Sequence, residues 1–382
     1  MIGFKNVCAY IEGKGKVNCD IAIKDEKIVQ IGSNLDITIP FKVEKNCIVV
    51  PGFIDQHVHG AIGSDVMDKS KDALENVSRA LASEGTTTYL ATTMTMAKED
   101  IIYSLKAVKD YNVIERSGAR ILGIHLEGPF ISKKYCGAQA PEHISELDTE
   151  LLEELIEESG NNIKLITIAP EKVGSKEFIC KLKENGVKIN AGHTNATFNQ
   201  ILESVGLGLD GISHLFNGQS KIHHRDLGTA GAGLLFDELY VEVICDFVHL
   251  SRETLKLILK TKPKDKIILI TDSMRAKGLA DGESELGGQK VIVSCGEARL
   301  EDGTLAGSTL KMNNAIKNMI DIGASFEDSI DFATKNPAKR LGIFNDYGSI
   351  AVGKHADFTV LDENFEVLLT IKDGKIIYQK RP

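Results

Sequence analysis

Apolar runs of strand length alternate with amphipathic segments of helical length through the middle of the chain. The runs that predict strands are Ile48–Asp55, Thr86–Thr92, Arg120–Leu126, Lys164–Ala169, Lys188–Ala191, Gly211–Ser213, Leu239–Cys245 and Lys266–Thr271. Helical patterns lie between them, such as Lys71–Glu84, Thr149–Ser159 and Arg252–Lys260. This alternation favours parallel βαβ units, and the number of repeats predicts an α/β fold in the form of a closed (β/α)8 barrel.

The two ends of the chain carry a different pattern, of short β-rich pieces broken by Gly, Asn and Asp. These pieces are Val17–Ile23, Lys27–Ile31 and Phe41–Val50 near the start, and Ala356–Asp362, Val367–Ile371 and Lys375–Tyr378 near the end. The pair Asp373-Gly374 between two apolar runs is a hairpin signal. We therefore expect a small β-sandwich domain from residues 1–50 and 348–382, and a catalytic barrel domain over residues 51–347.

An open, doubly wound sheet is the structural alternative to the barrel. It would call for a glycine-rich fingerprint directly after the first strand. The one candidate, Gly228 to Gly233, lies late in the chain and lacks the third glycine. The barrel is therefore favoured.

Composition narrows the functional classes. With 382 residues, the chain can form one large barrel or two ordinary domains, and its net charge of −9 argues against general affinity for nucleic acid or an anionic membrane. No apolar run reaches the length of a membrane span, and the start of the chain lacks the layout of a signal peptide. The seven cysteines are scattered and form no Cys-x-x-Cys pair. These features predict a cytoplasmic enzyme with reduced thiols.

The first predicted barrel strand runs into two histidines, His57 and His59, followed by a glycine. Side chains alternate along a strand, so both imidazoles project to the same side. Two neutral imidazoles on one face are a typical beginning of a zinc or iron site. A single strand-end histidine is more often an ordinary hydrogen-bonded polar residue, so the pair alone is weak evidence.

Four more polar groups follow the ends of later predicted strands. Glu127 follows the third strand, His193 the fifth, His214 the sixth and Asp272 the last. The carboxyl ends of barrel strands meet at one rim, which is where barrel active sites lie. A strand-end Asp is often only the N-cap of the next helix, but the coincidence of all these groups favours a metal site. His125 alternates with Glu127 and is either an orienting group or plain core.

These positions resemble the amidohydrolase superfamily, with His-x-His on strand one, single histidines on strands five and six, and an Asp on strand eight. Within it, the chain resembles the N-acetylglucosamine-6-phosphate deacetylase family nearly end to end. The matching motifs are Pro51–Gly60, Gly85–Thr88, His125–Phe130, Ala191–Ala196, Ser213–Asn217, His223–Asp226, Thr271–Asp272, Leu305–Ser308, Asn336–Ala338, and Gly348–Ile350 leading to Ala356–Asp357. Glu127 is the most selective mark, because many relatives in the superfamily carry a modified lysine as the bridging ligand.

The resemblance implies metal-dependent hydrolysis of the acetamide of N-acetylglucosamine 6-phosphate, giving glucosamine 6-phosphate and acetate, in amino-sugar catabolism and cell-wall sugar recycling. Glu127, His193 and His214 would hold the main metal, Zn²⁺ or Fe²⁺. His57 and His59, with Glu127 bridging, could hold a second, so one or two ions per subunit are expected. The metal would lower the pKa of its water from about 15.7 to about 7. Asp272 would be the acid and base of the reaction.

The resemblance also assigns contacts with the phosphorylated amino sugar to Asn217, Gly218, Arg225, His249, Gln139, Ala138 and Leu305. Arg225 and His249 would grip the 6-phosphate, with Arg225 reaching into the site of a neighbouring subunit, which implies a homodimer. Gly218 stands where Ala is more usual. Gln139 stands where the family often has a sugar-contacting histidine, and His143 is a nearby substitute.

Two rival functions share parts of this pattern. Another amidohydrolase, such as a cyclic amidase or an adenine deaminase-like enzyme, would have the same metal rim. It would not need Arg225, His249 or the Asn217 stretch. A non-catalytic barrel used for assembly would have lost the ligands, which this chain retains.

Overall fold

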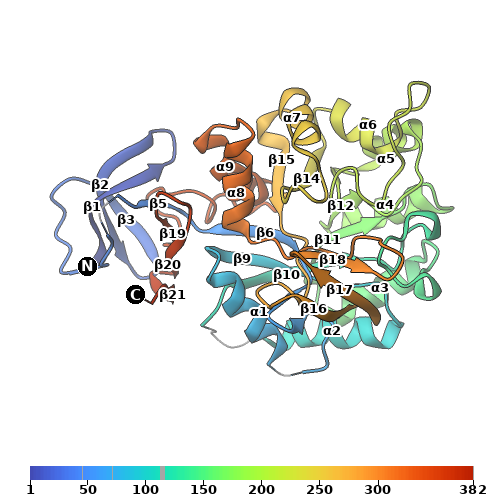
Figure 1. Cartoon of the computed structure of the whole chain (residues 1–382), viewed down its shortest axis with the longest axis horizontal. Coiled ribbons are helices and arrows are strands. Elements are labelled where there is room, and N and C mark those ends of the chain that lie inside the picture. Colours follow the sequence, from blue (N-terminus) through green and yellow to red (C-terminus); the bar gives the residue numbers. More distant parts are fainter. Residues whose placement is uncertain (45, 71, 112–116, 382) are drawn as a thin grey trace.

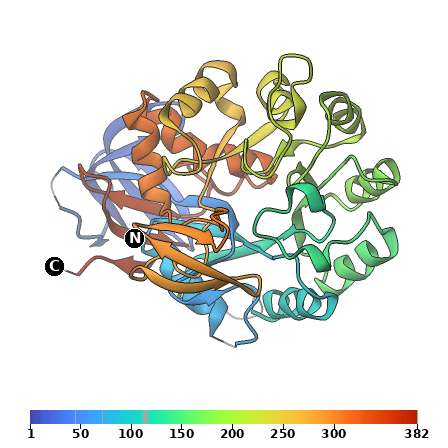
Figure 2. The same ribbon diagram turned by 45° about the vertical axis from the view of Figure 1, so that its right-hand side comes forward.

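The computed structural model describes residues 1–44, 46–70, 72–111 and 117–381, and its centre is a barrel of eight parallel strands. The barrel strands, in sequence order, are β6 (Phe53–Val58), β9 (Thr86–Thr92), β10 (Arg120–Glu127), β11 (Ile163–Ile168), β12 (Lys188–Ala191), β13 (Gly211–Ile212), β14 (Tyr240–Ile244) and β15 (Ile267–Ile270). Each strand pairs with the one before it in this series. Figure 2 shows helices arranged in an arc around the outside of these strands.

Hydrogen bonds between the ends of the first and last strands close the barrel. Val58 forms a parallel bridge with Ser273. The Asp272 amide donates to the His57 carbonyl at 2.9 Å, and the His59 amide donates to the Ser273 carbonyl at 2.9 Å. Closure therefore brings His57 and His59 next to Asp272, although the two segments lie at opposite ends of the barrel sequence.

Helices cover the outside of the barrel (Figure 1). They are α1 (Ala73–Ala82), α2 (Lys98–Tyr111), α3 (Thr149–Glu158), α4 (Ser175–Glu184), α5 (Phe198–Leu207), α6 (Gly228–Leu235), α7 (Arg252–Thr261), α8 (Met312–Asp321), α9 (Phe326–Phe332) and α10 (Lys335–Arg340). Short 3₁₀ turns are η1 (Lys133–Tyr135), η2 (Pro141–His143) and η3 (Lys264–Lys266). Local sequence sets several starts: Asp148 caps α3, and Thr197 forms a capping box with Gln200 at α5. None of the helices in the described part of the chain has the length and apolar character that a membrane crossing requires.

The two ends of the chain pair in a second sheet with its own core. Its strands are β1 (Ile2–Ile11), β2 (Gly15–Lys24), β3 (Lys27–Gly32), β4 (Ile39–Pro40), β5 (Ile48–Pro51), β19 (Phe358–Leu361), β20 (Val367–Lys372) and β21 (Lys375–Gln379). Phe4, Ile21 and Phe358 are among its buried residues. Asp373 and Gly374 both have positive φ between β20 and β21, as the hairpin signal predicts. The predicted combination of a barrel with a small β domain from both termini is confirmed.

The first predicted barrel strand, Ile48–Asp55, is wrong as a single element. Its first half is β5, which pairs with β1 and β19 in the terminal sheet, and its second half belongs to β6 of the barrel. The break falls at Gly52, where an added Cβ would lie 2.3 Å from the Thr87 side chain. Two successive buried strands give one continuous apolar run, so periodicity cannot separate them. Within the predicted strand Phe41–Val50, Lys45 lies outside the described residues, as does Lys71 at the start of a predicted helix.

A small antiparallel sheet after the last barrel strand was not predicted from the sequence. It consists of β16 (Gly282–Leu286), β17 (Gln289–Ser294) and β18 (Glu297–Leu300), drawn in orange in front of the barrel in Figure 1. The Gln289 side chain donates to the Ala138 carbonyl at 2.6 Å, and Glu285 pairs with Arg275 at 2.9 Å. We call β16–β18 the flap. Two very short strands, β7 (Gly60–Ala61) and β8 (Ser64–Asp65), complete the described elements.

Candidate metal and active site

The candidate site is built from six residues at the carboxyl ends of five barrel strands. Glu127 is the last residue of β10, and His57 lies near the end of β6. The other three single-residue contributors each follow their strand by two positions: His193 after β12, His214 after β13 and Asp272 after β15. All three have a left-handed backbone, with φ of 46°, 28° and 48°. Strained conformations of this kind cluster at functional sites, and here each one lies just beyond its strand, where the side chain enters the site.

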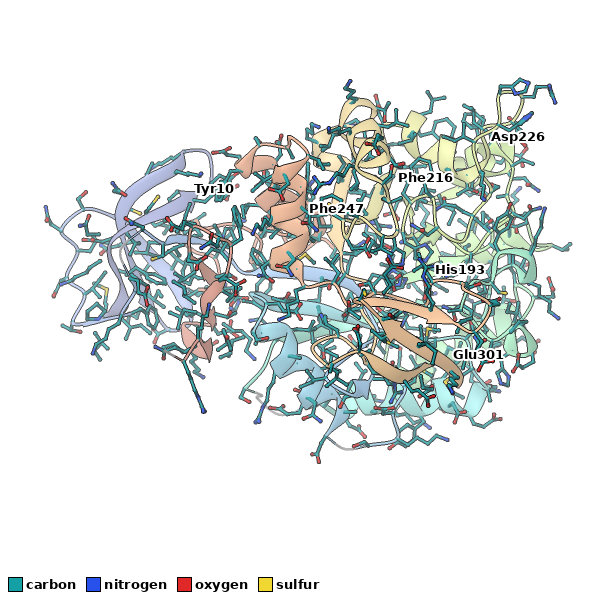
Figure 3. All side chains as sticks on the ribbon, viewed as in Figure 1. Tyr10, His193, Phe216, Asp226, Phe247 and Glu301 are labelled. Carbon is teal, nitrogen blue, oxygen red and sulfur yellow. The ribbon has the colours of Figure 1, made fainter. Side chains whose placement is uncertain are left out.

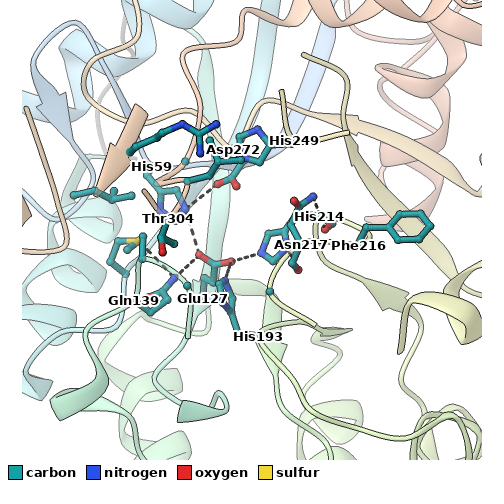
Figure 4. Close-up of a pocket in the computed structure, with 18 residues that line it drawn as sticks. His59, Glu127, Gln139, His193, His214, Phe216, Asn217, His249, Asp272 and Thr304 are labelled. Atoms are coloured by element: carbon teal, nitrogen blue, oxygen red, sulfur yellow. Dashed lines mark hydrogen bonds and ion pairs between the residues drawn. The ribbon is translucent and has the colours of Figure 1, made fainter. Parts of the chain in front are cut away.

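The carboxylate of Glu127 lies among four imidazoles, and Figure 4 shows three of them, His59, His193 and His214, around it. Its Oε1 lies 3.2 Å from His57 Nε2, 3.3 Å from His193 Nε2 and 3.1 Å from His214 Nε2. Its Oε2 lies 3.3 Å from His59 Nε2. The same nitrogen of every ring therefore faces the same carboxylate.

Asp272 borders the His57 and His59 side of this cluster. Its Oδ1 lies 3.2 Å from His59 Nε2 and 3.5 Å from His57 Nε2. Ligand atoms of His57, His59 and Asp272 lie within 4.8 Å of one another, and so do those of His57, Glu127 and His214. The structure thus brings together all six groups that the sequence predicts for this rim.

Hydrogen bonds on the far side of two rings set which nitrogen faces the centre. His193 Nδ1 donates to the Tyr135 carbonyl at 2.9 Å, and His214 Nδ1 donates to the Asn217 carbonyl at 3.0 Å. A carbonyl only accepts, so the proton of each neutral ring sits on Nδ1 and the Nε2 lone pair points inward. This is the arrangement that metal-ligating histidines need.

The charges of the cluster balance one another. Burial by itself raises the pKa of Glu127, but the charge on His57 and the hydrogen bond with His193 hold that pKa well below its ordinary value. Burial also raises the pKa of Asp272, and the charge on His57 and the hydrogen bond with His59 lower it to about 2. Burial lowers the pKa of His59, but its hydrogen bonds to Asp272 and Glu127 raise it to about 9. Two buried, ionised carboxylates thus demand positive charge, which imidazolium protons or a divalent cation supplies.

The donor set fits a divalent cation. Carboxylate oxygen and imidazole nitrogen are ligands for both zinc and iron. His57 Nε2 is buried and has no hydrogen-bond partner among the described residues, although Glu127 Oε1 is 3.2 Å away. An orphaned imidazole nitrogen that faces a carboxylate is suited to metal ligation.

A cavity of about 380 Å³ opens directly onto this cluster. This volume suits a small ligand such as a sugar phosphate. Six of the seven predicted substrate contacts line it: Ala138, Gln139, Asn217, Gly218, His249 and Leu305. His249 is held by Asp246, whose Oδ2 accepts from His249 Nδ1 at 2.6 Å.

Arg225 is the predicted substrate contact that the cavity lacks. The described residues that line the cavity do not include it, and its guanidinium instead contacts the ring of His224 at 2.7 Å. The neighbouring Asp226 lies at the outer edge of the molecule in Figure 3, whereas His193 lies in the middle. Arg225 therefore does not serve the cavity of its own chain in this structure.

The surroundings of Gln139 and His143 differ from those that the sequence predicts. Gln139 lines the cavity, but its Nε2 donates to Glu127 Oε2 at 2.7 Å and its Oε1 accepts from the Thr95 amide at 2.7 Å. It therefore braces the carboxylate at the centre of the cluster. His143 lines a separate cavity of about 230 Å³, so the structure does not bring it to the predicted site.

Sequence reasoning missed two charged residues at the site. Arg299 on the flap lines the cavity, where its Nη1 donates to the Gly303 carbonyl at 2.8 Å. Glu242 on β14 is fully buried, and its Oε2 accepts from His57 Nδ1 at 3.0 Å. The sequence could have indicated Glu242 as a functional residue, because it is the only charged residue within the apolar run Leu239–Cys245. His125 also packs against His57, with ring centroids 4.4 Å apart.

Comparisons with known proteins agree with this geometry. A model described as "Amidohydrolase family" matches residues 48–377. The chain is 40% identical to the N-acetylglucosamine-6-phosphate deacetylase of Bacillus subtilis (strain 168), over 98% of this chain and 96% of that protein. It is 36% identical to an N-acetylgalactosamine-6-phosphate deacetylase of Escherichia coli O157:H7, over 84% and 85% of the two chains. The crystal structure of an N-acetylglucosamine-6-phosphate deacetylase from Thermotoga maritima superposes with a TM-score of 0.90 at 37% identity, covering 99% of this chain and all of that one.

Proposed function

Because this chain belongs to the amidohydrolase family, we propose that it hydrolyses the acetamide of N-acetylglucosamine 6-phosphate to acetate and glucosamine 6-phosphate. The observation that carries this function is the cavity that opens onto Glu127, His193 and His214. Its size suits a phosphorylated sugar, and its wall holds the donor set of a hydrolytic metal site.

Glu127, His193 and His214 would hold the main cation, Zn²⁺ or Fe²⁺. His57 and His59 would hold a second one that shares Glu127. A bound divalent cation would supply positive charge that polarises the acetyl carbonyl. It would also lower the pKa of water, so that water can lose a proton and attack the carbonyl carbon at neutral pH. The protein's part is to keep the Nε2 atoms of the histidines aimed at one place.

Asp272 moves the proton in this proposal. It lines the cavity, and its low pKa leaves it ionised, so it can accept the proton of the attacking water. It then returns that proton to the nitrogen of the leaving amine, without which the amine is a poor leaving group. Gln139 holds the Glu127 carboxylate in place meanwhile.

Substrate choice tests the function directly. We expect acetate release from N-acetylglucosamine 6-phosphate to exceed release from unphosphorylated N-acetylglucosamine, because the phosphate adds charge-assisted contacts. N-acetylgalactosamine 6-phosphate belongs in the same assay, since one relative acts on that epimer. Enzymatic measurement of free acetate provides the readout. No acetate from any of the three sugars, together with turnover of a cyclic amide or adenine, would favour the rival amidohydrolase function.

Arg225 would bind the 6-phosphate of the sugar that occupies the cavity of the neighbouring subunit in a homodimer. Its place outside its own cavity supports this arrangement. Replacing Arg225 with Ala should therefore raise KM for the phosphorylated sugar by about 10- to 100-fold, the cost of a hydrogen bond to a charged group. KM for the unphosphorylated sugar should stay unchanged. An equal rise for both sugars would contradict a phosphate role.

Mixed dimers separate binding in trans from binding in cis. An R225A subunit keeps Asp272 and would receive Arg225 from a D272N partner, so that one hybrid site is complete. Mixing the two variants should restore activity at low substrate concentration. If the mixture is no more active than its parts, Arg225 does not act across an interface.

A further inference from the structure

Glu242 is a charged residue inside the barrel that the proposed reaction does not use. Its carboxylate is fully buried, and Glu242 is not among the described residues that line the cavity. Oε2 accepts from His57 Nδ1 at 3.0 Å, and Oε1 accepts from Gln56 Nε2 at 2.6 Å. A nearby cation, Arg340 Nη1, is 3.9 Å from Oε1. Burying a charged carboxylate costs free energy of folding, so we expect Glu242 to have a function that offsets this cost.

We propose that Glu242 is a positioning residue that makes His57 a metal ligand and so allows this chain to hold a second divalent cation. A carboxylate only accepts hydrogen bonds, so it keeps a proton on His57 Nδ1. The Nε2 lone pair of the neutral ring is then aimed at Glu127, 3.2 Å away, and at Asp272, 3.5 Å away. A carboxylate behind a histidine also makes the ring a stronger ligand.

The four rim histidines differ in what stands behind them, and this difference separates the two cation positions. Main-chain carbonyls orient His193 and His214. His59 Nδ1 is buried with no hydrogen-bond partner among the described residues. His57 is therefore the one rim ligand that the described structure orients with a side-chain carboxylate. The second position depends on Glu242, whereas the main position does not.

The surroundings of Glu242 permit a graded set of substitutions. Gln56 Oε1 is buried and has no hydrogen-bond partner within the described parts of the chain, so its amide can turn to accept a hydrogen bond. A Gln at position 242 can then donate to Gln56 and still accept from His57 Nδ1. E242Q thus keeps the hydrogen bond and removes only the charge. E242L removes the acceptor altogether at similar volume.

Counting bound metal tests the proposal. The full-length protein and its variants are stripped with chelator, loaded with Zn²⁺ and measured for zinc per chain, with affinities from chelator competition. We expect two zinc ions in the unchanged protein and one in H57Q. In E242Q, affinity at the second position should fall about 10- to 100-fold, and E242L should hold one zinc. The double variant H57Q/E242Q should match H57Q, because Glu242 acts through His57.

A matched control separates positioning from general damage. Glu84 is also a buried carboxylate, paired with Lys277 at 3.0 Å, and none of the contacts that the described structure gives it involves a rim histidine. E84Q should lose thermal stability and keep both zinc ions. The proposal is overturned if the unchanged protein binds one zinc, if E242L keeps two with unchanged affinity, or if E242L loses the main ion as well.

The role of Glu242 rests on the proposed function in one respect, because it requires a divalent cation at this rim. The role of Glu242 and the deacetylase function can therefore be disproved separately. Two zinc ions without acetate release would remove the deacetylase function and leave the role of Glu242 intact. Acetate release with a zinc count that does not respond to Glu242 would do the reverse.

Discussion

Replacing Asp272 with Asn is expected to lower kcat for acetate release by about 10²- to 10⁴-fold, the usual contribution of a general acid and base. Asn has nearly the same shape as Asp, but it cannot take a proton from water or hand one to the amine. Asp272 lines the cavity beside His59, so the substituted side chain still borders the substrate. The measurement is kcat and KM for N-acetylglucosamine 6-phosphate.

Metal content is the control for this variant. D272N should keep the main cation, because Glu127, His193 and His214 are unchanged. Its KM should stay within a few-fold of the original value, in line with an effect on the chemical step alone. A D272N protein that turns over at the original rate would rule out proton transfer by Asp272. Loss of metal from D272N would show that Asp272 acts as a ligand.

The second large effect is expected at Glu127. E127Q replaces the only carboxylate among the described residues that faces all four imidazole Nε2 atoms with a neutral amide. The amide oxygen is a weaker ligand, and the amide NH₂ group repels a cation. We expect both cation positions to lose metal and acetate release to fall to background.

A neighbouring substitution provides the control for E127Q. Gln139 also contacts this carboxylate, but it is only a brace for it. Q139L should retain metal at reduced affinity and retain part of the activity. The account would be contradicted at its centre if E127Q bound zinc as tightly as the unchanged protein.

Much of the fold was predictable because the barrel repeats one local pattern. Strand and helix periods are local properties, so the alternation from Thr86 to Thr271 predicts the barrel without knowledge of contacts. The prediction of one strand over Ile48–Asp55 was wrong because both halves of this run are buried, one in each sheet. The flap was missed because its short strands, such as Glu297–Leu300, carry little apolar signal of their own.

The six rim groups were predictable for a related reason. Parallel strands in a closed barrel all end at one rim, so a residue's position after its strand is enough to place it there. Which residues support the rim was not predictable in this way. Glu242 and His57 are 185 positions apart in sequence, and their contact follows from packing across the barrel interior. Likewise, that Gln139 braces Glu127 depends on the loop after β10, whose path the sequence pattern leaves open.

Titrating the metal-free protein with zinc while recording acetate release from N-acetylglucosamine 6-phosphate tests the central claim most directly. Protein stripped by chelator should release no acetate, and activity should return in proportion to zinc until the rim positions are filled. Full activity in stripped protein, with no response to added zinc or iron, would contradict a reaction that depends on a cation at Glu127, His193 and His214.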